Sequence, residues 1–324
     1  MGTRDVGSQW CDDYRYAEAA AAELAVRWWR LKEARTVTTT VAMGRRLTLL
    51  LAGVLVAAAM ASAAAVHARE ATGAEYRAQV VGGIGVPNGK YPFVAALLDV
   101  RNGNTPFQQQ ICGGTLIDQN GVLTAAHCVY GRSAAPLRVT IGRTVLGSSQ
   151  GKKRGVSRIF VHRRYDPNLD DAYDAAVLKL SSPVGGVVPI TLSTARQNRL
   201  EKPGRNATVA GWGVKTRQSP NYHEPDIYAN RLREVQVPIV SDAKARSVYG
   251  SSYFPRLMVA AGKAGRDACL GDSGGPIFAK VSGEYVQIGV TSWATGCGTS
   301  RYPGAYTEVN TSSIRNFIIN AVRR

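Results

Sequence analysis

Residues 271–276 read Gly-Asp-Ser-Gly-Gly-Pro, and this stretch decides how the chain is interpreted. The glycines around Ser273 permit tight turns that leave the amides of Gly271 and Ser273 free to point at one spot. A serine hydroxyl is a weak nucleophile, so it needs a neighbouring base, a group that orients this base, and donors for the developing oxyanion. The stretch predicts that Ser273 is a catalytic serine, whose base and orienting group must come from other parts of the chain.

His127 is the candidate base. The chain has four histidines, of which His67 lies in an apolar leader segment. His162 and His223 lie in charged or proline-flanked stretches, which predict solvated loops. His127 follows Thr-Ala-Ala and directly precedes Cys128, a residue that can fix its position. The sequence therefore favours His127 as the base.

Short apolar or alternating runs, separated by Gly, Pro, Asn and Ser, fill the chain from Val80 onward and predict strands. The runs are 93–100, 116–117, 122–124, 176–180, 208–210, 285–291 and 305–309. Asn120-Gly121 between two of them predicts a hairpin. Strands this short and numerous are typical of antiparallel sandwiches or barrels.

One convincing helix is expected, at residues 312–323, where Ser312 or Ser313 can cap the first turn. Its apolar residues share one face, as helical periodicity requires. They are Ile314, Phe317, Ile318 and Ala321. A loop-like stretch at 193–203 is expected to divide the chain into two halves.

The segment 124–128, Thr-Ala-Ala-His-Cys, together with residues 271–276, resembles the trypsin and chymotrypsin family of serine proteases. The likeness runs from Val80 to the C-terminal helix. It implies an all-β fold of two six-stranded antiparallel barrels, about 80–195 and about 196–310, with the C-terminal helix and an active site between the barrels. It also implies peptide hydrolysis by acyl transfer, with Ser273 as nucleophile and the amides of Gly271 and Ser273 as the oxyanion site.

The group that orients His127 is sought among Asp170, Asp171 and Asp174. A solvated acidic loop is the plain alternative for all three. Residues 173–178 resemble the family segment that supplies the orienting aspartate, and Asp174 stands directly before the apolar run. The resemblance implies that Asp174 holds the tautomer of His127 and stabilises the imidazolium.

The resemblance also implies a substrate pocket. Asp267 matches the carboxylate at the pocket base in members that cleave after Arg or Lys, and Gly304 matches the glycine that keeps the pocket open. Ser292, Trp293 and Ala294 resemble the strand that pairs with extended substrate. Ala294 departs from the family's usual glycine, so a shift between Arg and Lys, or a preference for small residues, is the alternative.

Five cysteines are present, and Cys11 lies in the N-terminal segment. The other four allow three disulfide pairings from sequence alone. The resemblance selects Cys112 with Cys128 and Cys269 with Cys297. The first pair is expected to anchor His127.

Val80 begins a segment, Val-Val-Gly-Gly, that resembles the family's mature N-terminus. The freed amine of Val80 is expected to fold inward onto Asp272, so activation is proteolytic. The cut before Val80 follows Gln79, a residue after which a protease specific for Arg or Lys does not cleave. The nearest basic residue, Arg77, lies two residues too early. A different activating protease is therefore expected.

The N-terminal region holds a targeting signal. Arg45-Arg46 precedes the apolar stretch 47–66, which predicts a secretory signal peptide at 43–68 and a propeptide at 69–79. A membrane signal anchor is the alternative. Met43 is the expected start, so residues 1–42 are interpreted as a non-native extension. Because Arg45 and Arg46 are adjacent, export can follow either the Sec pathway or the twin-arginine pathway for folded proteins, and the sequence does not distinguish them.

The formal net charge is +17, which favours anionic partners in general. No nucleic-acid recognition motif accompanies it, and the basic run 152–154 is expected to be a solvated loop. No Asp or Glu lies between Arg132 and Tyr165, so we expect no calcium site there, and neither a metal nor a cofactor elsewhere.

The expected partners are protein or peptide substrates, an activating protease and protein inhibitors. We expect a secreted, extracellular monomer without a membrane anchor after signal cleavage. A protease-like binding protein that has lost catalysis is a further alternative, but it predicts a missing triad member or a blocked pocket, and the sequence shows neither.

Overall fold

The structure, a computed structural model, describes residues 80–169, 171–215 and 228–324. The predicted extension at 1–42, signal peptide at 43–68 and propeptide at 69–79 lie outside the described residues, as do His67 and His223. No helix in the described part of the chain is long and apolar enough to cross a membrane.

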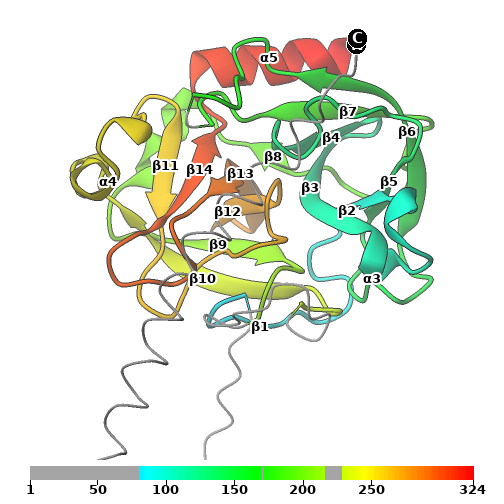
Figure 1. Ribbon diagram of the computed structural model, residues 1–324, viewed down its shortest axis with the longest axis horizontal. Coiled ribbons are helices and arrows are strands. Elements are labelled where there is room, and N and C mark those ends of the chain that lie inside the picture. The colour runs from blue at the N-terminus through cyan, green and yellow to red at the C-terminus, as the bar shows by residue number, and fades with distance from the viewer. Residues whose placement is uncertain (1–79, 170, 216–227) are drawn as a thin grey trace, which may run out of the picture. The chain divides into compact units, whose positions relative to one another are not determined.

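Six strands of the N-terminal half close into a barrel, which Figure 1 shows in cyan and green. They are β2 (Val94–Asp99), β3 (Gln110–Asp118), β4 (Gly121–Thr124), β5 (Leu137–Ile141), β6 (Lys152–Val161) and β7 (Ala176–Leu180). Their order around the barrel is β2-β3-β4-β7-β6-β5, and every pairing is antiparallel. The predicted hairpin at Asn120-Gly121 joins β3 to β4.

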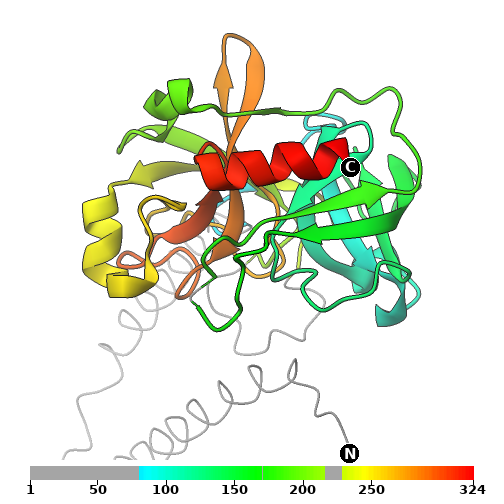
Figure 2. The same ribbon diagram turned by 90° about the horizontal axis from the view of Figure 1, so that it is seen from above.

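The C-terminal half forms a second ring of six antiparallel strands, beside the first barrel in Figures 1 and 2. They are β9 (Asn206–Gly211), β10 (Arg233–Val240), β11 (Met258–Ala261), β12 (Pro276–Val281), β13 (Glu284–Trp293) and β14 (Gly304–Glu308). They pair in the order β9-β10-β11-β14-β13-β12 and back to β9. Two short strands, β1 (Ile84–Gly85) and β8 (Thr191–Leu192), pair with β10 and β13. The all-β, two-barrel prediction is confirmed.

Alternating side chains explain strand β10. In β10, Val235, Val237 and Ile239 are buried in the second core while Gln236 between them is exposed, the period of two expected for a sheet with one buried face. A glycine fits where the barrel interior is crowded: a Cβ on Gly289 would lie 2.9 Å from Cγ2 of Ile277. Glycine at 289 thus leaves room for Ile277 on the neighbouring strand β12.

The C-terminal helix α5 (Ser312–Arg323) lies where it was predicted. Ile314, Ile318 and Ala321 are buried against the core of the first barrel, where each isoleucine contributes about 1.5–3 kcal/mol by burial. Thr311, rather than either expected serine, is the N-cap, and its side chain makes no capping hydrogen bond. The helix packs on the core of the first barrel, and Figure 2 shows it lying across the middle of the molecule.

The remaining helices are short and were not predicted. They are α3 (Pro106–Gln109), α4 (Asp242–Tyr249) and the 3-10 turns η2 (Val100–Asn102), η3 (Ala195–Glu201) and η5 (Gly250–Ser252). Helix α4 buries only Ala245, so it has no apolar face for sequence periodicity to detect. Turn η3 lies in the expected dividing stretch between the two barrels.

Two expectations for the first barrel were wrong. Residues 152–154 are not a loop but the start of β6, paired with β5, because their charged side chains extend into solvent while the backbone bonds the neighbouring strand. His162 is not solvated but buried, stacked on Tyr173 with ring centroids 4.9 Å apart. Its Nε2 lies 3.2 Å from Oγ of Ser313, so the ring joins β6 to α5.

Candidate active site

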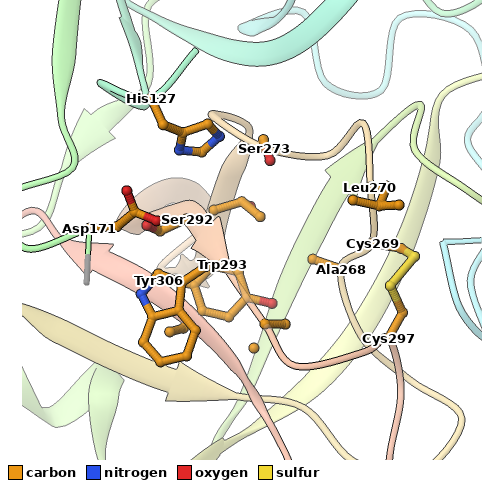
Figure 3. A pocket seen from close by; sticks show the side chains of 14 residues that line it. His127, Asp171, Ala268, Cys269, Leu270, Ser273, Ser292, Trp293, Cys297 and Tyr306 are labelled. Carbon is orange, nitrogen blue, oxygen red and sulfur yellow. A yellow bond between two sulfur atoms is a disulfide. The ribbon is translucent and has the colours of Figure 1, made fainter. Parts of the chain in front are cut away.

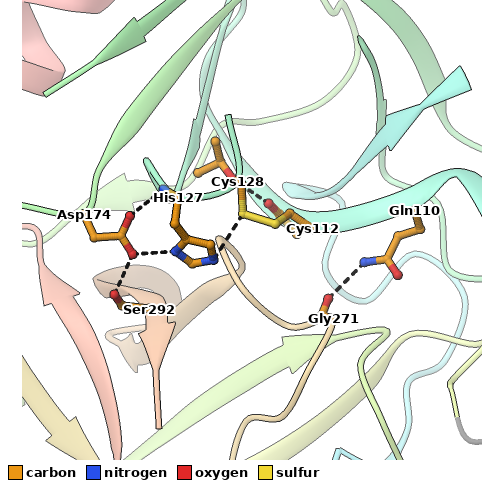
Figure 4. Close-up of a disulfide and its surroundings, with 9 residues drawn as sticks. Gln110, Cys112, His127, Cys128, Asp174, Gly271 and Ser292 are labelled. Carbon is orange, nitrogen blue, oxygen red and sulfur yellow. Dashed lines mark hydrogen bonds and ion pairs between the residues drawn. A yellow bond between two sulfur atoms is a disulfide. The ribbon is translucent and has the colours of Figure 1, made fainter. Parts of the chain in front are cut away.

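His127 and Asp174 meet because their strands are neighbours. His127 follows β4, Asp174 precedes β7, and Thr124 of β4 pairs with Ala176 of β7. Nδ1 of His127 lies 2.8 Å from Oδ2 of Asp174, and the backbone amide of His127 donates to Oδ1 at 2.9 Å (Figure 4). Two bonds to one carboxylate fix both the ring and the backbone of His127.

The second barrel completes the surroundings of Asp174, which is fully buried. Oγ of Ser292, on β13, donates to Oδ2 at 2.5 Å, and Oγ1 of Thr307, on β14, donates to the backbone carbonyl of Asp174 at 2.8 Å. Burial alone would raise the pKa of Asp174, but the charge of His127 and the hydrogen bonds that the carboxylate accepts from His127 and Ser292 outweigh it and lower the pKa. The carboxylate is therefore held ionised.

The ring of His127 has the opposite balance. Burial lowers its pKa, but the charge of Asp174 and its hydrogen bond act more strongly, so the pKa of His127 is raised above the ordinary value of 6.5. The side chain keeps 27% of its surface exposed, which leaves one edge of the ring facing the cleft. The imidazole is thus a base that an approaching proton donor can reach.

Two disulfides brace the site, with the pairing that the resemblance implies. Cys112 is bonded to Cys128, and Cys269 to Cys297. Sγ of Cys128 lies 3.6 Å from Nε2 of His127 (Figure 4). The Cys112, His127 and Cys128 group is the one cluster of potential metal ligands found among the described residues, and its sulfur atoms are already bonded to each other.

Ser273 lies in the loop that leads into β12, and the first barrel holds this loop from the other side. The amide of Gly113 donates to the carbonyl of Ser273 at 2.7 Å, and Nε2 of Gln110 donates to the carbonyl of Gly271 at 2.9 Å. Gly274 must be glycine, because its φ is +78° and a Cβ would lie 2.2 Å from Oγ1 of Thr124. The loop conformation is therefore set by contacts between barrels.

The amides of Gly271 and Ser273 donate to no acceptor in the part of the chain that the structure describes. Gly271 has a φ of +90°, which the sequence-based expectation of a tight glycine turn requires. His127 and Ser273 line the same cavity of about 350 Å³, one from each barrel (Figure 3). Ser273 and His127 thus face one space.

The same cavity contains most of the predicted pocket residues. Ser292, Trp293, Ala294 and Gly304 line it. Asp267 is not on the wall but fully buried beneath it: a Cβ on Gly304 would lie 2.7 Å from Oδ1 of Asp267. Glycine at 304 is therefore what leaves space above this carboxylate.

Asp267 is buried without a positive partner. Its oxygens accept the amides of Ala268 at 2.9 Å and Gly298 at 3.1 Å, and no ion pair to it exists among the described residues. Burial raises the pKa of Asp267 to about 7, against the lowering effect of these hydrogen bonds. A cation placed above it would gain a desolvated partner.

Asp272 repeats this arrangement. It is fully buried, accepts the amides of Gly213 at 2.8 Å and Cys269 at 2.9 Å, and forms no ion pair in the described regions. Burial raises its pKa to about 7. A Cβ on Gly211 would lie 2.1 Å from Oδ1 of Asp272, so glycine is needed there.

Val80 lies close to the segment that carries Asp267. Its side chain is buried in the core cluster that includes Ala268, and the next carbonyl, that of Val81, accepts the amide of Asp267 at 3.2 Å. The segment is thus packed inside the second barrel's wall.

Several residues that build the site carry no local sequence signal. Gln110, Gly113, Gly213 and Thr307 act through contacts with residues more than 50 positions away. Nothing in their neighbouring sequence marks them, because each is selected by its partner in space.

The titration of His127 tests the balance of charges in this site. We expect the ring to titrate above 6.5 by NMR, and Asp174→Asn to move the midpoint downward, because burial then acts without the opposing charge. The raised pKa stabilises the folded protein below pH 6.5, and this contribution is lost as pH rises through the folded-state pKa. His127→Gln assigns the resonance, and a midpoint at or below 6.5 in the unaltered protein contradicts the expectation.

Comparison with known proteins agrees with this geometry. Residues 80–318 match the Trypsin family model. The chain is 38% identical to the protein named "Trypsin" from Saccharopolyspora erythraea, over 71% of this chain and 93% of that protein. It is 34% identical to "Trypsin-1" from Astacus astacus (71% and 95%) and 35% identical to "Trypsin-like protease" from Streptomyces glaucescens (79% and 86%). The chain therefore belongs to the trypsin family and is a serine endopeptidase of that family.

Proposed function

We propose that this endopeptidase cleaves after Arg or Lys and becomes active only when its chain is cut before Val80. The observation that carries the specificity is Asp267, a carboxylate buried under the cavity with two backbone amides and no positive partner in the described structure. A substrate guanidinium or ammonium would supply the missing charge.

In the proposed reaction, Oγ of Ser273 attacks the carbonyl carbon of the scissile peptide while His127 takes the hydroxyl proton. The tetrahedral oxyanion binds to the amides of Gly271 and Ser273, and each such donor contributes about 3 kcal/mol to the transition state. His127 then gives its proton to the leaving amine, and water repeats the sequence on the acyl-enzyme. Asp174 holds the His127 ring in position throughout.

Residues 292–294 are proposed to pair with the substrate backbone. The side-chain hydroxyl of Ser292 donates to Asp174, and Trp293 and Ala294 line the cavity beside it. The methyl group of Ala294 lies on the cavity wall, where the family's usual residue has none. A narrower entrance is the physical basis for the alternative, a preference for small residues.

Activation is proposed to supply a positive partner for Asp272. A cut between Gln79 and Val80 would create an amine on a segment that is already packed beside Ala268 and Asp267. Pairing of that amine with Asp272 would compensate a charge that has only two backbone donors. Because Gln79 is not basic, the activating protease is proposed to be another enzyme.

The same proposal covers the setting of the enzyme. We propose a secreted, extracellular monomer that requires no cofactor, with protein or peptide substrates, an activating protease and protein inhibitors as partners. The apolar leader 43–68 supports export.

Anilide substrates test specificity and nucleophile together. We expect hydrolysis of arginine and lysine anilides, with Ser273→Ala lowering kcat on the order of 10⁶-fold. Asp267→Ser should lower kcat/KM for arginine about 10²- to 10⁴-fold, because an unpaired buried charge costs about 3–5 kcal/mol. The matched control Glu284→Gln removes an exposed charge at the start of β13 and should change neither value.

Two outcomes contradict the proposal. Hydrolysis of alanine anilide alone would assign the enzyme to small residues, as Ala294 allows. No turnover of any anilide by the correctly processed protein would favour a binding protein that has lost catalysis.

N-terminal sequencing of the active secreted protein tests the processing step. We expect the chain to begin at Val80, because only that terminus places an amine on the segment packed beside Asp267. An active protein that still carries residues 69–79 would contradict the proposed activation.

A further inference from the structure

The side chain of Gln110 reaches from the first barrel to the loop that carries Ser273. Gln110 is the first residue of β3, and its Nε2 donates to the carbonyl of Gly271 at 2.9 Å (Figure 4). The two residues are 161 positions apart in the chain. The side chain is half-buried, so solvent competes with this bond less than it would at an exposed site. One side-chain amide of the first barrel thus holds a carbonyl close to the proposed nucleophile.

The three successive carbonyls of residues 271–273 all accept hydrogen bonds. The first accepts from Gln110, the second from the amide of Gly275 at 2.9 Å, and the third from the amide of Gly113 at 2.7 Å. The amides of Gly275 and Gly113 belong to the backbone, so every residue type except proline would supply them. Gln110 is the side-chain donor among the three, and its bond is therefore the one that depends on the type of residue.

Gly271 needs such a contact because its own backbone is weakly restricted. Its φ is +90°, and glycine has no Cβ to prevent rotation toward other conformations. Two bonds fix the peptide that links Gly271 to Asp272: Gln110 donates to its carbonyl, and its amide donates to the carbonyl of Cys269 at 2.9 Å. A fixed peptide on the carboxyl side of Gly271 limits the directions in which the amide of Gly271 can point.

We propose that Gln110 is a positioning residue for the oxyanion site, because its side-chain amide orients the Gly271 peptide before substrate binds. The inference rests on the proposed function, in which the amides of Gly271 and Ser273 bind the oxyanion, and it adds the residue that prepares one of them. Donors that are already oriented stabilise a developing charge without reorganising during the reaction. Loss of the Gln110 bond should therefore weaken binding of the transition state more than binding of the substrate.

Direct contact with the substrate is the competing role for Gln110. Its side chain lines a cavity of about 860 Å³ that also has His127 and Ser273 on its wall. Residues 292–294, which are proposed to pair with the substrate before the cut, line the other cavity instead. The cavity beside Gln110 is thus left for substrate residues after the cut. A substrate that lacks such residues separates the two roles.

Two substitutions of Gln110 test the inference. Gln110→Met keeps the length of the side chain and removes the donor, whereas Gln110→Glu keeps the shape and places a second acceptor opposite the Gly271 carbonyl. The substrate is an arginine coumarin amide, which has no amino acid after the cut, and the enzyme is the protein cut before Val80. We expect kcat to fall about fivefold in Gln110→Met and on the order of 10²-fold in Gln110→Glu, with KM changed less than about twofold. A role in filling space predicts the opposite order, because glutamate matches glutamine in shape.

Two inhibitors provide a readout that does not depend on turnover. With an arginine aldehyde, Oγ of Ser273 adds to the aldehyde carbon, its proton passes to His127, and the aldehyde oxygen becomes an anion in the oxyanion site. Benzamidine offers only a cation for the pocket above Asp267. We expect the inhibition constant of the aldehyde to rise by about the same factor as kcat falls, and that of benzamidine to change less than about twofold.

Gln236→Met and Gln236→Glu are the matched controls, because Gln236 lies exposed on β10. Both should leave kcat and the two inhibition constants unchanged. An unchanged kcat in the Gln110 variants, or a smaller loss in Gln110→Glu than in Gln110→Met, overturns the inference.

Two further results would also overturn it. Equal weakening of the aldehyde and benzamidine would show that Gln110 supports the whole loop rather than the oxyanion site. A loss of activity only with peptides that extend beyond the cut would show that Gln110 is a substrate contact. Failure of the unaltered, processed enzyme to hydrolyse the coumarin amide contradicts the proposed function itself, whereas turnover that is insensitive to Gln110 contradicts only this inference.

Discussion

The rest of the structure depends on the hydrogen bonds that the buried carboxylate of Asp174 accepts from both barrels. It accepts bonds from His127 in the first barrel and from Ser292 in the second, and its backbone carbonyl accepts from Thr307. A buried charge left without such partners would cost several kcal/mol. The two barrels must therefore meet in one arrangement, and that arrangement places His127 and Ser273 on one cavity.

Two other buried acids, Asp267 and Asp272, differ from Asp174 in having no charged partner among the described residues. Asp267 and Asp272 have backbone donors only, and burial raises the pKa of each to about 7. In the function we propose, a basic substrate side chain pairs with Asp267 and the Val80 amine pairs with Asp272. Specificity and activation would then follow from one physical principle, the compensation of a desolvated charge.

The sequence predicted those parts of the molecule that have local signals. Segments around His127 and Ser273 carried the family resemblance, short apolar runs marked strands such as 176–180, and helical periodicity marked α5. Contacts between distant segments had no such signal. The bond from Gln110 to Gly271 and the burial of His162 against α5 exist only after the barrels have formed, and α4 has too small a buried face to show periodicity.

A fluorophosphonate that reacts only with an activated serine tests the central claim, that Ser273 is a nucleophile assembled by release of Val80. The intact precursor and the form cut after Gln79 would be labelled side by side, and the adduct located by mass spectrometry. We predict one adduct per molecule, at Ser273, in the cut form and almost none in the precursor. Equal labelling of the intact precursor, or an adduct at another serine, would contradict it.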